Sequence, residues 1–355
     1  MQTLTRQLIK EGFDISIVGI NCTSTYEEEN DQGVHIYRLP ANMIKGLKWY
    51  YNFRSINNKL LEMHQNNPID IVESTEMGLA FIKKRKEIKY IIRLNGGHHF
   101  FAESEQRSVN RWKGFQEKRS FAKADRILGV SEYVLDHTAK YIDFAEKRGP
   151  VVYNPANFAR FYEASPEKKV DGRIFFAGTI CEKKGVRQLI LAMPMIKKEF
   201  VDAHLIIAGR DWKFADGSSY INYIQEFINP EVRDFITFLG PVDNDKIPAL
   251  IEEAEVCVYP SHMEAMPLAW IEVMSMGKAF VGSNTGPAAE IINHGITGLM
   301  CNPLNVADIA EKTISVLKDK DFGALLGRNA RADMLNRFAT KRILQQNIDF
   351  YRGIV

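Results

Sequence analysis

The segment VCVYPSHMEAMPLAWIEVMSMG, residues 256–277, decides the fold because a strand runs directly into a helix within it. Residues 256–259 form a continuous apolar run, which is typical of a parallel strand covered on both faces. The helix that follows is predicted to begin at Pro267, and its apolar side chains point to all sides, so we expect it to be buried. A strand followed at once by a buried helix is the repeating unit of a doubly wound α/β fold.

Similar apolar, β-branched runs recur on both sides of this segment, each followed by a longer amphipathic stretch. They lie at residues 15–20, 36–39, 69–72, 90–94 and 127–130, and again at 174–177, 205–208, 236–239, 256–259 and 280–282. The two series predict two Rossmann-like doubly wound domains.

The domain boundaries are predicted from a stretch with prolines and charges that separates the two series. We expect an amino-terminal domain over residues 1–150, a linker over 151–172 and a carboxy-terminal domain over 173–321. Helices should fill residues 322–355.

The first residues, MQTLTRQLIKEG, have helical spacing with Leu4 and Leu8 on one face, and Gly12 ends the helix. Doubly wound domains usually open on a strand whose following loop contributes to the ligand crevice. We therefore expect that the first strand of the amino-terminal domain is missing, that Leu4 and Leu8 pack against the remaining sheet, and that the domain is fragile.

Length and composition fit a folded protein of two domains, with 355 residues, 45% hydrophobic and 25% charged. The 46 basic and 44 acidic residues nearly balance, which argues against nucleic acid as a partner. The basic surplus is concentrated between Lys83 and Arg126, where 13 basic residues face 5 acidic ones. This segment fits either a solvated surface or a peripheral contact with an anionic membrane or substrate.

Four isolated cysteines, Cys22, Cys181, Cys257 and Cys301, indicate neither a zinc site nor a disulfide framework. No run approaches the ~18 apolar residues of a membrane span, and Asp14 interrupts the first apolar run, so no signal peptide is expected. We expect a cytoplasmic protein, with membrane association limited to the cytoplasmic face.

Two carboxylates mark the segment that decides the fold. Glu272 lies on the otherwise apolar helix, where a lone charge is costly, and Glu264 follows the strand at the edge where open α/β sheets bind ligands. On composition alone two interpretations remain open. Either Glu272 pairs with a nearby lysine or caps a backbone group while Glu264 caps the helix, or both carboxylates bind a ligand.

The order of motifs settles which family the sequence is similar to. EAMPLAWIE resembles the E-x7-E motif of the retaining GT-B glycosyltransferases of family 4, and the flanking text follows the same order from FAGTICEKKG to NTGPAAEIINHGITGLMCNP. The resemblance covers most of the chain. It implies a GT-B fold, in which two Rossmann-like domains face each other across a cleft and the last helix, within residues 322–355, returns to the amino-terminal domain.

The resemblance implies a role for each motif residue. Glu264 would lie at the donor sugar and Glu272 at the ribose, whose two hydroxyls an ionised carboxylate can accept together. Backbone groups of Met266 and Leu268 would face the sugar and the diphosphate. Pro267 has no N–H, so a donor often present there is absent.

The FAGTICEKKG stretch places Gly178 and Lys184 where the family binds the diphosphate, but Thr179 replaces the family's arginine. Arg210, at the end of the next predicted strand, either supplies the missing positive charge or is an exposed arginine without a partner; both interpretations remain open. The stretch lacks the spacing of a Walker A motif.

Thr285 and Gly286 precede a predicted helix, whose free N–H groups would bind a diphosphate without a metal ion. Glu290 matches the family's glutamate in that helix, although an acidic residue in a first turn is favoured in any case. We expect no metal and no cofactor beyond the nucleotide-diphosphate sugar.

The acceptor side is predicted from RLNGGHHFF, residues 93–101. Asn95 stands where relatives often have a histidine, which leaves His98, as a shifted catalytic residue, or His99 in its place; both also fit a surface loop. Glu73, near the end of the 69–72 run, is an alternative acceptor contact.

These features predict a retaining glycosyltransferase that moves a sugar from a nucleotide-diphosphate sugar to a glycan or lipid-linked acceptor, in the synthesis of cell-surface polysaccharide or glycoconjugates. Lys184 and backbone dipoles would stabilise the leaving group. A nicotinamide-dependent dehydrogenase is disfavoured, because no G-x-G-x-x-G follows an early strand. A non-catalytic sugar-binding or partner subunit remains the alternative.

Overall fold

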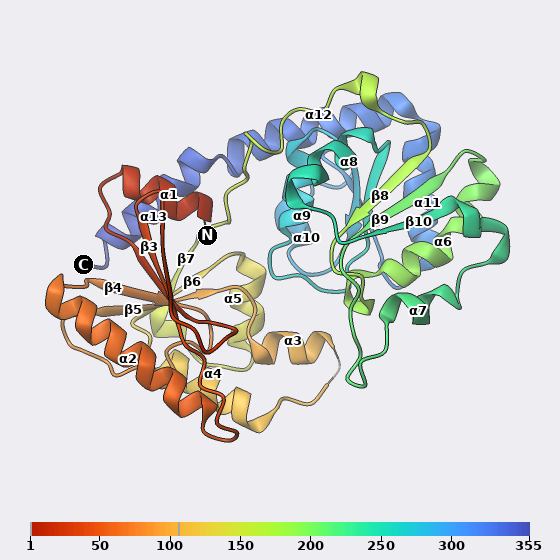
Figure 1. Ribbon diagram of the computed structural model, residues 1–355. Coiled ribbons are helices and arrows are strands. Elements are labelled where there is room, and N and C mark those ends of the chain that lie inside the picture. Colours follow the sequence, from red (N-terminus) through yellow and green to blue (C-terminus); the bar gives the residue numbers. More distant parts are fainter. Residues whose placement is uncertain (1, 106) are drawn as a thin grey trace. The chain divides into compact units, whose positions relative to one another are not determined.

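The chain divides into two compact α/β units in the computed structural model, which describes residues 2–105 and 107–355 (Figure 1). Unit 1 contains the residues up to Val130, together with Val134–Pro155 and Thr340–Val355. Unit 2 contains Ser131–Tyr133 and Ala156–Ala339. The doubly wound α/β class expected from the sequence is confirmed.

Unit 2 is built on one parallel sheet of six strands in the order β10-β9-β8-β11-β12-β13. Its strands are β8 (Arg173–Ala177), β9 (His204–Ala208), β10 (Ile236–Gly240), β11 (Val256–Tyr259), β12 (Ala279–Ser283) and β13 (Leu299–Cys301). Its helices are α6 (Val186–Glu199), α7 (Tyr220–Gln225), α8 (Ile247–Glu253), α9 (Leu268–Ser275), α10 (Ala288–Ile291), α11 (Val306–Lys318) and α12 (Lys320–Arg337).

Aromatic side chains fill the core of unit 2 around its central strands. Phe175 and Phe176 of β8, Phe280 of β12 and Trp270 of α9 are completely buried. The residues of β11 are buried throughout, as the continuous apolar run 256–259 predicts. Helix α9 was expected to be apolar and buried on all sides, but Leu268 at its start is 46% exposed.

Unit 1 carries two separate sheets instead of one. The first, β1-β3-β2, consists of β1 (Ser16–Ile20), β2 (Glu27–Asp31) and β3 (Val34–Leu39). The second, β4-β5-β6-β7, is parallel throughout and consists of β4 (Ile71–Ser74), β5 (Lys89–Leu94), β6 (Arg126–Gly129) and β7 (Arg148–Val151). Strand β1 is parallel to β3, and each pairs with no strand of the second sheet among the described residues.

The helices of unit 1 connect and cover these strands. They are α1 (Gln2–Lys10), α2 (Lys48–Asn66), α3 (His98–Ser104), α4 (Arg111–Lys123), α5 (Glu132–Ala139), which begins in unit 2, and α13 (Thr340–Arg352). Helix α13 lies beside α1 in Figure 1.

The strand β2 pairs antiparallel with β3 through a two-residue turn at Gln32 and Gly33. Both turn residues have positive φ, 55° and 95°, which is the geometry of a type I′ hairpin. Three glutamates open β2, and charged side chains of this kind protect an edge strand against pairing with another chain.

The opening helix packs differently from our expectation. Leu4 and Leu8 are buried in a cluster with Leu344 and Ile348 of α13, against which Phe13, Ile15 and Tyr351 also pack. The end of the chain thus supplies the apolar surface that this helix needs.

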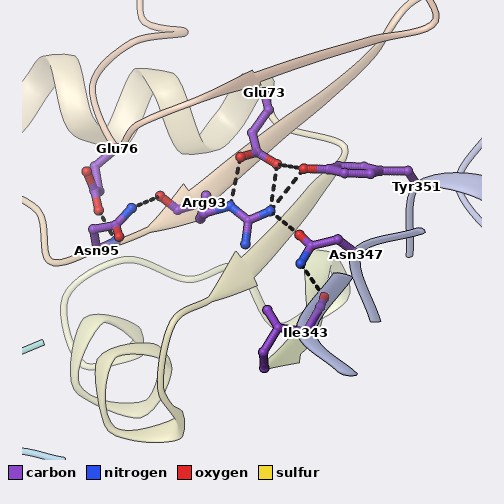
Figure 2. Close-up of polar contacts among 7 residues, drawn as sticks. All are labelled: Glu73, Glu76, Arg93, Asn95, Ile343, Asn347 and Tyr351. Carbon is purple, nitrogen blue, oxygen red and sulfur yellow. Dashed lines mark hydrogen bonds and ion pairs between the residues drawn. The ribbon is translucent and has the colours of Figure 1, made fainter. Parts of the chain in front are cut away.

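Helix α13 is also fixed to the second sheet by a polar network (Figure 2). The guanidinium of Arg93 on β5 donates to the Glu73 carboxylate on β4 at 2.7 and 3.2 Å and to Asn347 Oδ1 at 2.7 Å. The Tyr351 hydroxyl donates to Glu73 at 2.8 Å and lies 3.0 Å from the guanidinium. The neighbouring Glu73 and Tyr351 raise the pKa of Arg93 despite its burial.

Cys22 is exposed, whereas Cys181, Cys257 and Cys301 are buried and free. Burial raises the pKa of the Cys257 and Cys301 thiols to about 12. In the described part of the chain, no helix combines the length and the apolar character needed to span a membrane.

Candidate active site

Three loops meet at the carboxyl edge of the unit 2 sheet, after β8, β11 and β12. A Cβ atom on Gly185 would lie 1.9 Å from the Pro260 carbonyl oxygen, and one on Gly286 would lie 2.9 Å from that of Glu264. Both glycines have positive φ, 70° and 65°, which side chains rarely adopt. Only glycine therefore permits this close approach of the three loops.

Hydrogen bonds hold the same loops together. The N–H of His262 donates to the carbonyl of Lys183 at 2.8 Å. The hydroxyl of Thr285 lies 3.1 and 3.0 Å from the carbonyl oxygens of Ser261 and His262. Thr285 thus serves as a brace between the β11 and β12 loops.

Lys184 and Glu264 form an ion pair at the centre of these loops. The Lys184 Nζ donates to Glu264 Oε1 at 2.5 Å, and the two side chains are 26% and 12% exposed. The residues are 80 positions apart, and the approach of the β8 loop to the β11 loop brings them together. An ammonium beside a carboxylate at an open sheet edge can receive a phosphate group in exchange for its partner.

Glu272 lies on α9 and is partly buried. Within residues 2–105 and 107–355 no hydrogen bond or ion pair engages this carboxylate, and burial raises its pKa, while the nearby Arg160 opposes the rise. Arg160 itself has a buried Nε without a hydrogen-bond partner. The interpretation that Glu272 pairs with a cation in the folded chain is not supported by this geometry.

Thr179 and Arg210 lie side by side at the ends of β8 and β9. The Arg210 Nε donates to the Thr179 hydroxyl at 3.4 Å, and the arginine is exposed. The two strand ends are held close because a Cβ on Gly209 would lie 1.7 Å from the Gly178 carbonyl oxygen. Arg210 therefore lies beside Thr179 and can supply the positive charge that this threonine lacks.

Two helix starts contribute backbone N–H groups. Helix α9 begins at Leu268 after Pro267 in the cap position, one residue later than predicted, and Met266 is buried just before it. The predicted helix after Thr285 and Gly286 is the single turn α10, so its dipole is small. Backbone N–H groups of the loop at Thr285 and Gly286, and not the helix dipole, are therefore the main groups that could bind an anion at this position.

The Glu290 carboxylate accepts hydrogen bonds from the N–H groups of Glu132 and Tyr133, at 2.9 and 2.7 Å. These residues open α5 and belong to unit 2. The geometry gives Glu290 a capping contact in the chain without ligand, beside the donor-binding role that the resemblance implies.

In unit 1, His98 and His99 surround the buried carboxylate of Glu117. That carboxylate accepts the backbone N–H groups of both histidines, at 2.9 and 3.0 Å, and His99 Nδ1 lies 2.5 Å from it. His98 Nε2 accepts the N–H of Asn110 at 2.9 Å, and burial lowers the pKa of His98. His98 is therefore neutral with its proton on Nδ1.

Asn95 and Glu73, the other acceptor-side candidates, are both engaged (Figure 2). The N–H of Asn95 donates to Glu76, and its side chain donates to the Arg93 carbonyl at 3.0 Å. Burial raises the pKa of Glu76. Glu73 lies near the end of β4. It bonds with Arg93 and Tyr351, so it links β4 to β5 and to α13.

Sequence reasoning missed Arg160, Glu76 and Glu117, because their importance comes from burial and not from a motif. Gly97 offered one signal for Glu117, since a Cβ there would lie 1.6 Å from Glu117 Oε1. Among the residues that the structure describes, no group of three or more His, Cys, Asp or Glu side chains could hold a metal ion.

Comparison with known proteins identifies the class. The family Glycosyl transferases group 1 matches residues 158–333, and Glycosyltransferase Family 4 matches residues 1–160. The chain belongs to the GT-B glycosyltransferases of this family and is a glycosyltransferase enzyme.

Individual relatives extend over nearly the whole chain. N-acetyl-alpha-D-glucosaminyl L-malate synthase of Bacillus anthracis is 28% identical, over 91% of this chain and 84% of its own. Sucrose-phosphate synthase of Thermosynechococcus elongatus shares the fold with a TM-score of 0.85 at 18% identity, covering 99% of this chain and 91% of its own. Anabaena HepE, solved with UDP and glucose, has a TM-score of 0.78 at 17% identity, covering 99% and 95%.

Proposed function

We propose that this enzyme transfers a glycosyl group from a nucleoside diphosphate sugar to a glycan or lipid-linked acceptor, with retention of the anomeric configuration, in the synthesis of cell-surface polysaccharide or glycoconjugates. The observation that carries the proposal is the arrangement at the unit 2 sheet edge. Lys184 and Glu264 pair across the loops that follow β8 and β11. Glu272, whose carboxylate has no hydrogen-bond partner in the described structure, lies on α9, which follows the β11 loop.

Glu272 is the proposed ribose ligand. Its carboxylate lacks a donor in the described structure and is half-buried, and a ribose diol supplies two hydroxyl donors of the right kind. Binding would satisfy a carboxylate that is costly to bury alone. Arg160 would keep this carboxylate ionised when the diol is bound.

In the proposed chemical step, the bond between the anomeric carbon and the diphosphate oxygen breaks, the acceptor hydroxyl oxygen forms a bond to the same face of that carbon, and the hydroxyl proton passes to the leaving diphosphate. Negative charge develops on the diphosphate in this step. Lys184 Nζ leaves Glu264 and neutralises that charge, assisted by Arg210 and by loop N–H groups at Met266, Leu268 and Gly286. Glu264, released from the pair, faces the sugar. This account requires neither a metal ion nor a cofactor.

Unit 1 is the proposed acceptor half. Because His98 accepts the Asn110 N–H at Nε2, its Nδ1–H is the group that can donate to an acceptor or sugar oxygen. The Glu117 carboxylate accepts the backbone N–H groups of His98 and His99 and so fixes the position of both residues. Asn95 stands beside them at the end of β5.

A peripheral contact with an anionic membrane is part of the proposal. Residues of the basic segment, Trp112 and Phe115, are 43% and 50% exposed and stack 5.8 Å apart. Trp112 also contacts Trp49 at 5.2 Å, beside the exposed Tyr50. We call Trp49, Tyr50, Trp112 and Phe115 the aromatic patch; Lys48, Arg111 and Lys113 are exposed cations next to these residues in the sequence.

An aromatic patch bordered by lysine and arginine matches the interface of an anionic bilayer, where aromatic rings partition and cations meet lipid head groups. The sequence showed the charge, whereas only the fold shows that the aromatic side chains gather beside it. A cytoplasmic enzyme acting on a lipid-linked acceptor would use such a contact.

The experiment that tests the function is a screen of UDP- and GDP-sugars by thermal shift, followed by a transfer assay with the donor that binds. The anomeric configuration of the product is then determined by NMR. We expect a rise in melting temperature, nucleotide release that depends on acceptor, and retained configuration. Sugar binding without any nucleotide release would favour the non-catalytic partner subunit instead.

A further inference from the structure

A cavity opens at the edge of the second sheet of unit 1 where its strands begin, which is the edge opposite to Asn95. Its volume is about 650 Å³. The starts of β5, β6 and β7 line one side, and the end of α13 with the residues just after it lines the other. Among the described residues that line this cavity, none was assigned above to the donor or to the acceptor.

Alternation along the strands explains why cations border the cavity. Side chains two residues apart in a strand point to the same face of the sheet. Ile91 of β5 and Leu128 of β6 form a buried cluster with Ile343, so they lie on the face that α13 covers. Lys89 and Arg126 each stand two residues earlier in the same strands, at the rim of this face.

The chain does not neutralise these two cations. Within the described residues, the side chain of Lys89 makes no hydrogen bond or ion pair. Arg126 has only the carbonyl oxygens of Asp125 and Glu146, each 3.5 Å from its Nη1. A third cation of the lining, Arg148, is paired with Asp136 at 2.8 Å. Two positive charges without a carboxylate partner therefore border the cavity.

Two carboxylates also belong to the lining, and they differ in what they can still bind. Asp125 accepts hydrogen bonds from Lys84 Nζ at 2.5 Å and from the N–H of Tyr90 at 2.8 Å, so Lys84 balances its charge. Asp349 is exposed and accepts only the side-chain amide of Gln345, at 2.7 Å. An ionised carboxylate has about four acceptor positions, so Asp349 can accept further hydroxyl donors.

Phe350 and Ile354 form an apolar wall beside these charges, and both are partly buried. Gly149 at the start of β7 makes room for the ring. A Cβ atom on Gly149 would lie 3.4 Å from Phe350 Cε2 and 2.9 Å from the Ile127 carbonyl oxygen. The cavity thus combines two free cations, a carboxylate acceptor and an apolar surface.

The surroundings favour a small soluble ligand over a membrane. The cations near the cavity lie in residues 83–89, 123–126 and 145–150, all described, and none of these ranges exposes a large hydrophobic side chain. A bilayer would meet charge alone here, unlike at the aromatic patch. The volume lies within the range of about 300–1,000 Å³ that is usual for small-molecule sites, and it exceeds what a phosphate ion alone would fill.

We propose that this cavity binds a sugar phosphate. The phosphate would lie between Lys89 and Arg126, whose guanidinium can bind two of its oxygens. Hydroxyl groups of the sugar would donate to the Asp349 carboxylate, and the C–H face of the ring would lie on Phe350. The bound ligand would join α13 to the starts of β5 and β6. This site is separate from the donor site and does not depend on the proposed function.

The test measures binding of glucose 6-phosphate to the whole chain by isothermal titration calorimetry, with glucose and orthophosphate as separate probes. The double variant Lys89→Gln and Arg126→Gln removes the two free cations. The matched control, Lys86→Gln and Lys118→Gln, removes two exposed cations of unit 1 outside the lining. Lys184→Met separates this cavity from the donor site. Amide hydrogen exchange of the original chain then locates the bound ligand without any variant.

We expect glucose 6-phosphate to bind the original chain, the control and Lys184→Met equally, and to bind the Lys89 and Arg126 double variant at least about tenfold more weakly. The ligand should slow exchange in residues 349–354 and at the start of β6. Glucose and orthophosphate should each bind at least about tenfold more weakly than glucose 6-phosphate.

Four results would overturn the proposal. They are the absence of binding, equal affinity in all four proteins, loss of binding in Lys184→Met, and orthophosphate that binds as tightly as glucose 6-phosphate. Vesicles of phosphatidylglycerol provide a further arm of the test. If the Lys89 and Arg126 double variant loses binding to these vesicles while no protein binds glucose 6-phosphate, the cations face a membrane and the proposal is wrong.

Discussion

Glu272 combines a cost to stability with a proposed role in binding the ribose, so one variant can separate the two effects. Burial raises the pKa of its carboxyl group, which means that the folded chain disfavours the ionised form. We predict that Glu272→Gln raises the stability of the ligand-free protein by about 0.5–2 kcal/mol at pH 7.5 and abolishes the thermal shift given by the donor.

The sign of the pH dependence follows from the raised pKa. The ionised carboxylate costs stability once the pH exceeds the folded-state pKa, and the cost vanishes below about pH 4, where glutamate is protonated in both states. The advantage of Glu272→Gln should therefore shrink on acidification. Glu226→Gln, which changes an exposed glutamate, is the control; undiminished nucleotide binding by Glu272→Gln would contradict the ribose assignment.

Lys184 should matter for turnover far more than for folding. Its ion pair with Glu264 is partly exposed, so Lys184→Met should change the unfolding free energy by about 1 kcal/mol or less. The loss of the charge that stabilises the leaving diphosphate should lower kcat by about 10²–10³. Lys198→Met on the exposed side of α6 is the charge control, and equal rates for both variants would argue against the proposed step.

At the scale of elements, α13 is tied to the sheet of unit 1 by its Tyr351 hydroxyl. That hydroxyl bonds with Glu73 and Arg93, and burial beside Glu73 raises the pKa of Tyr351. Tyr351→Phe keeps the ring but removes bonds to two charged groups, so we predict a loss of about 1.5–3 kcal/mol in unfolding free energy.

Chemical denaturation measures this loss. Tyr26→Phe is a suitable control, because the Tyr26 hydroxyl bonds to Glu28 on the exposed β2 hairpin and should contribute little. If both variants lose the same stability, the network of Figure 2 does not anchor α13.

The strands that periodicity predicted are those with apolar runs, such as β5 and β11. The sequence analysis missed β2, β7 and β13. Strand β2 reads EEEND, which has no apolar alternation because it is an exposed edge strand. The turn residues Gln32 and Gly33 were its only local signal.

Residues of the candidate site could be predicted from the sequence where they lie in a recognisable motif. Glu264, Glu272 and Lys184 stand out from their segments, but the contact between Lys184 and Glu264 depends on how two loops pack across Gly185. Spacing along the chain carries no information on such a contact. The same holds for Glu117, whose partners lie 18 and 19 residues away.

For the molecule as a whole, the leaving-group account predicts independence from divalent metal ions. In the proposed step, Lys184 and Arg210 would supply the positive charge that a metal ion supplies in other transferases. EDTA should leave the transfer rate unchanged. Activity that EDTA abolishes and Mg²⁺ or Mn²⁺ restores would contradict this account.

The aromatic patch predicts selective binding to anionic vesicles. The protein should sediment with phosphatidylglycerol vesicles more than with phosphatidylcholine vesicles, and less so as salt rises. The double variant Trp112→Ser and Phe115→Ser should lower the bound fraction about tenfold, because two exposed rings are lost.

A matched control for the vesicle experiment lies in unit 2. Val201 and Leu304 are 74% and 72% exposed, so the double variant Val201→Ser and Leu304→Ser removes exposed apolar surface away from the patch. It should bind vesicles like the unmodified protein. If both double variants lose binding equally, the contact is unspecific and the aromatic patch is not a membrane surface.

The distribution of the four thiols makes the protein convenient for fluorescence work. Alkylation requires a thiolate, and burial raises the pKa of the Cys181, Cys257 and Cys301 thiols, so none of the three should form one at pH 7.5. A maleimide dye should therefore attach to Cys22 alone without any engineering. Because Cys22 lies two residues after the end of β1, such a dye can report structural changes at that end of the strand.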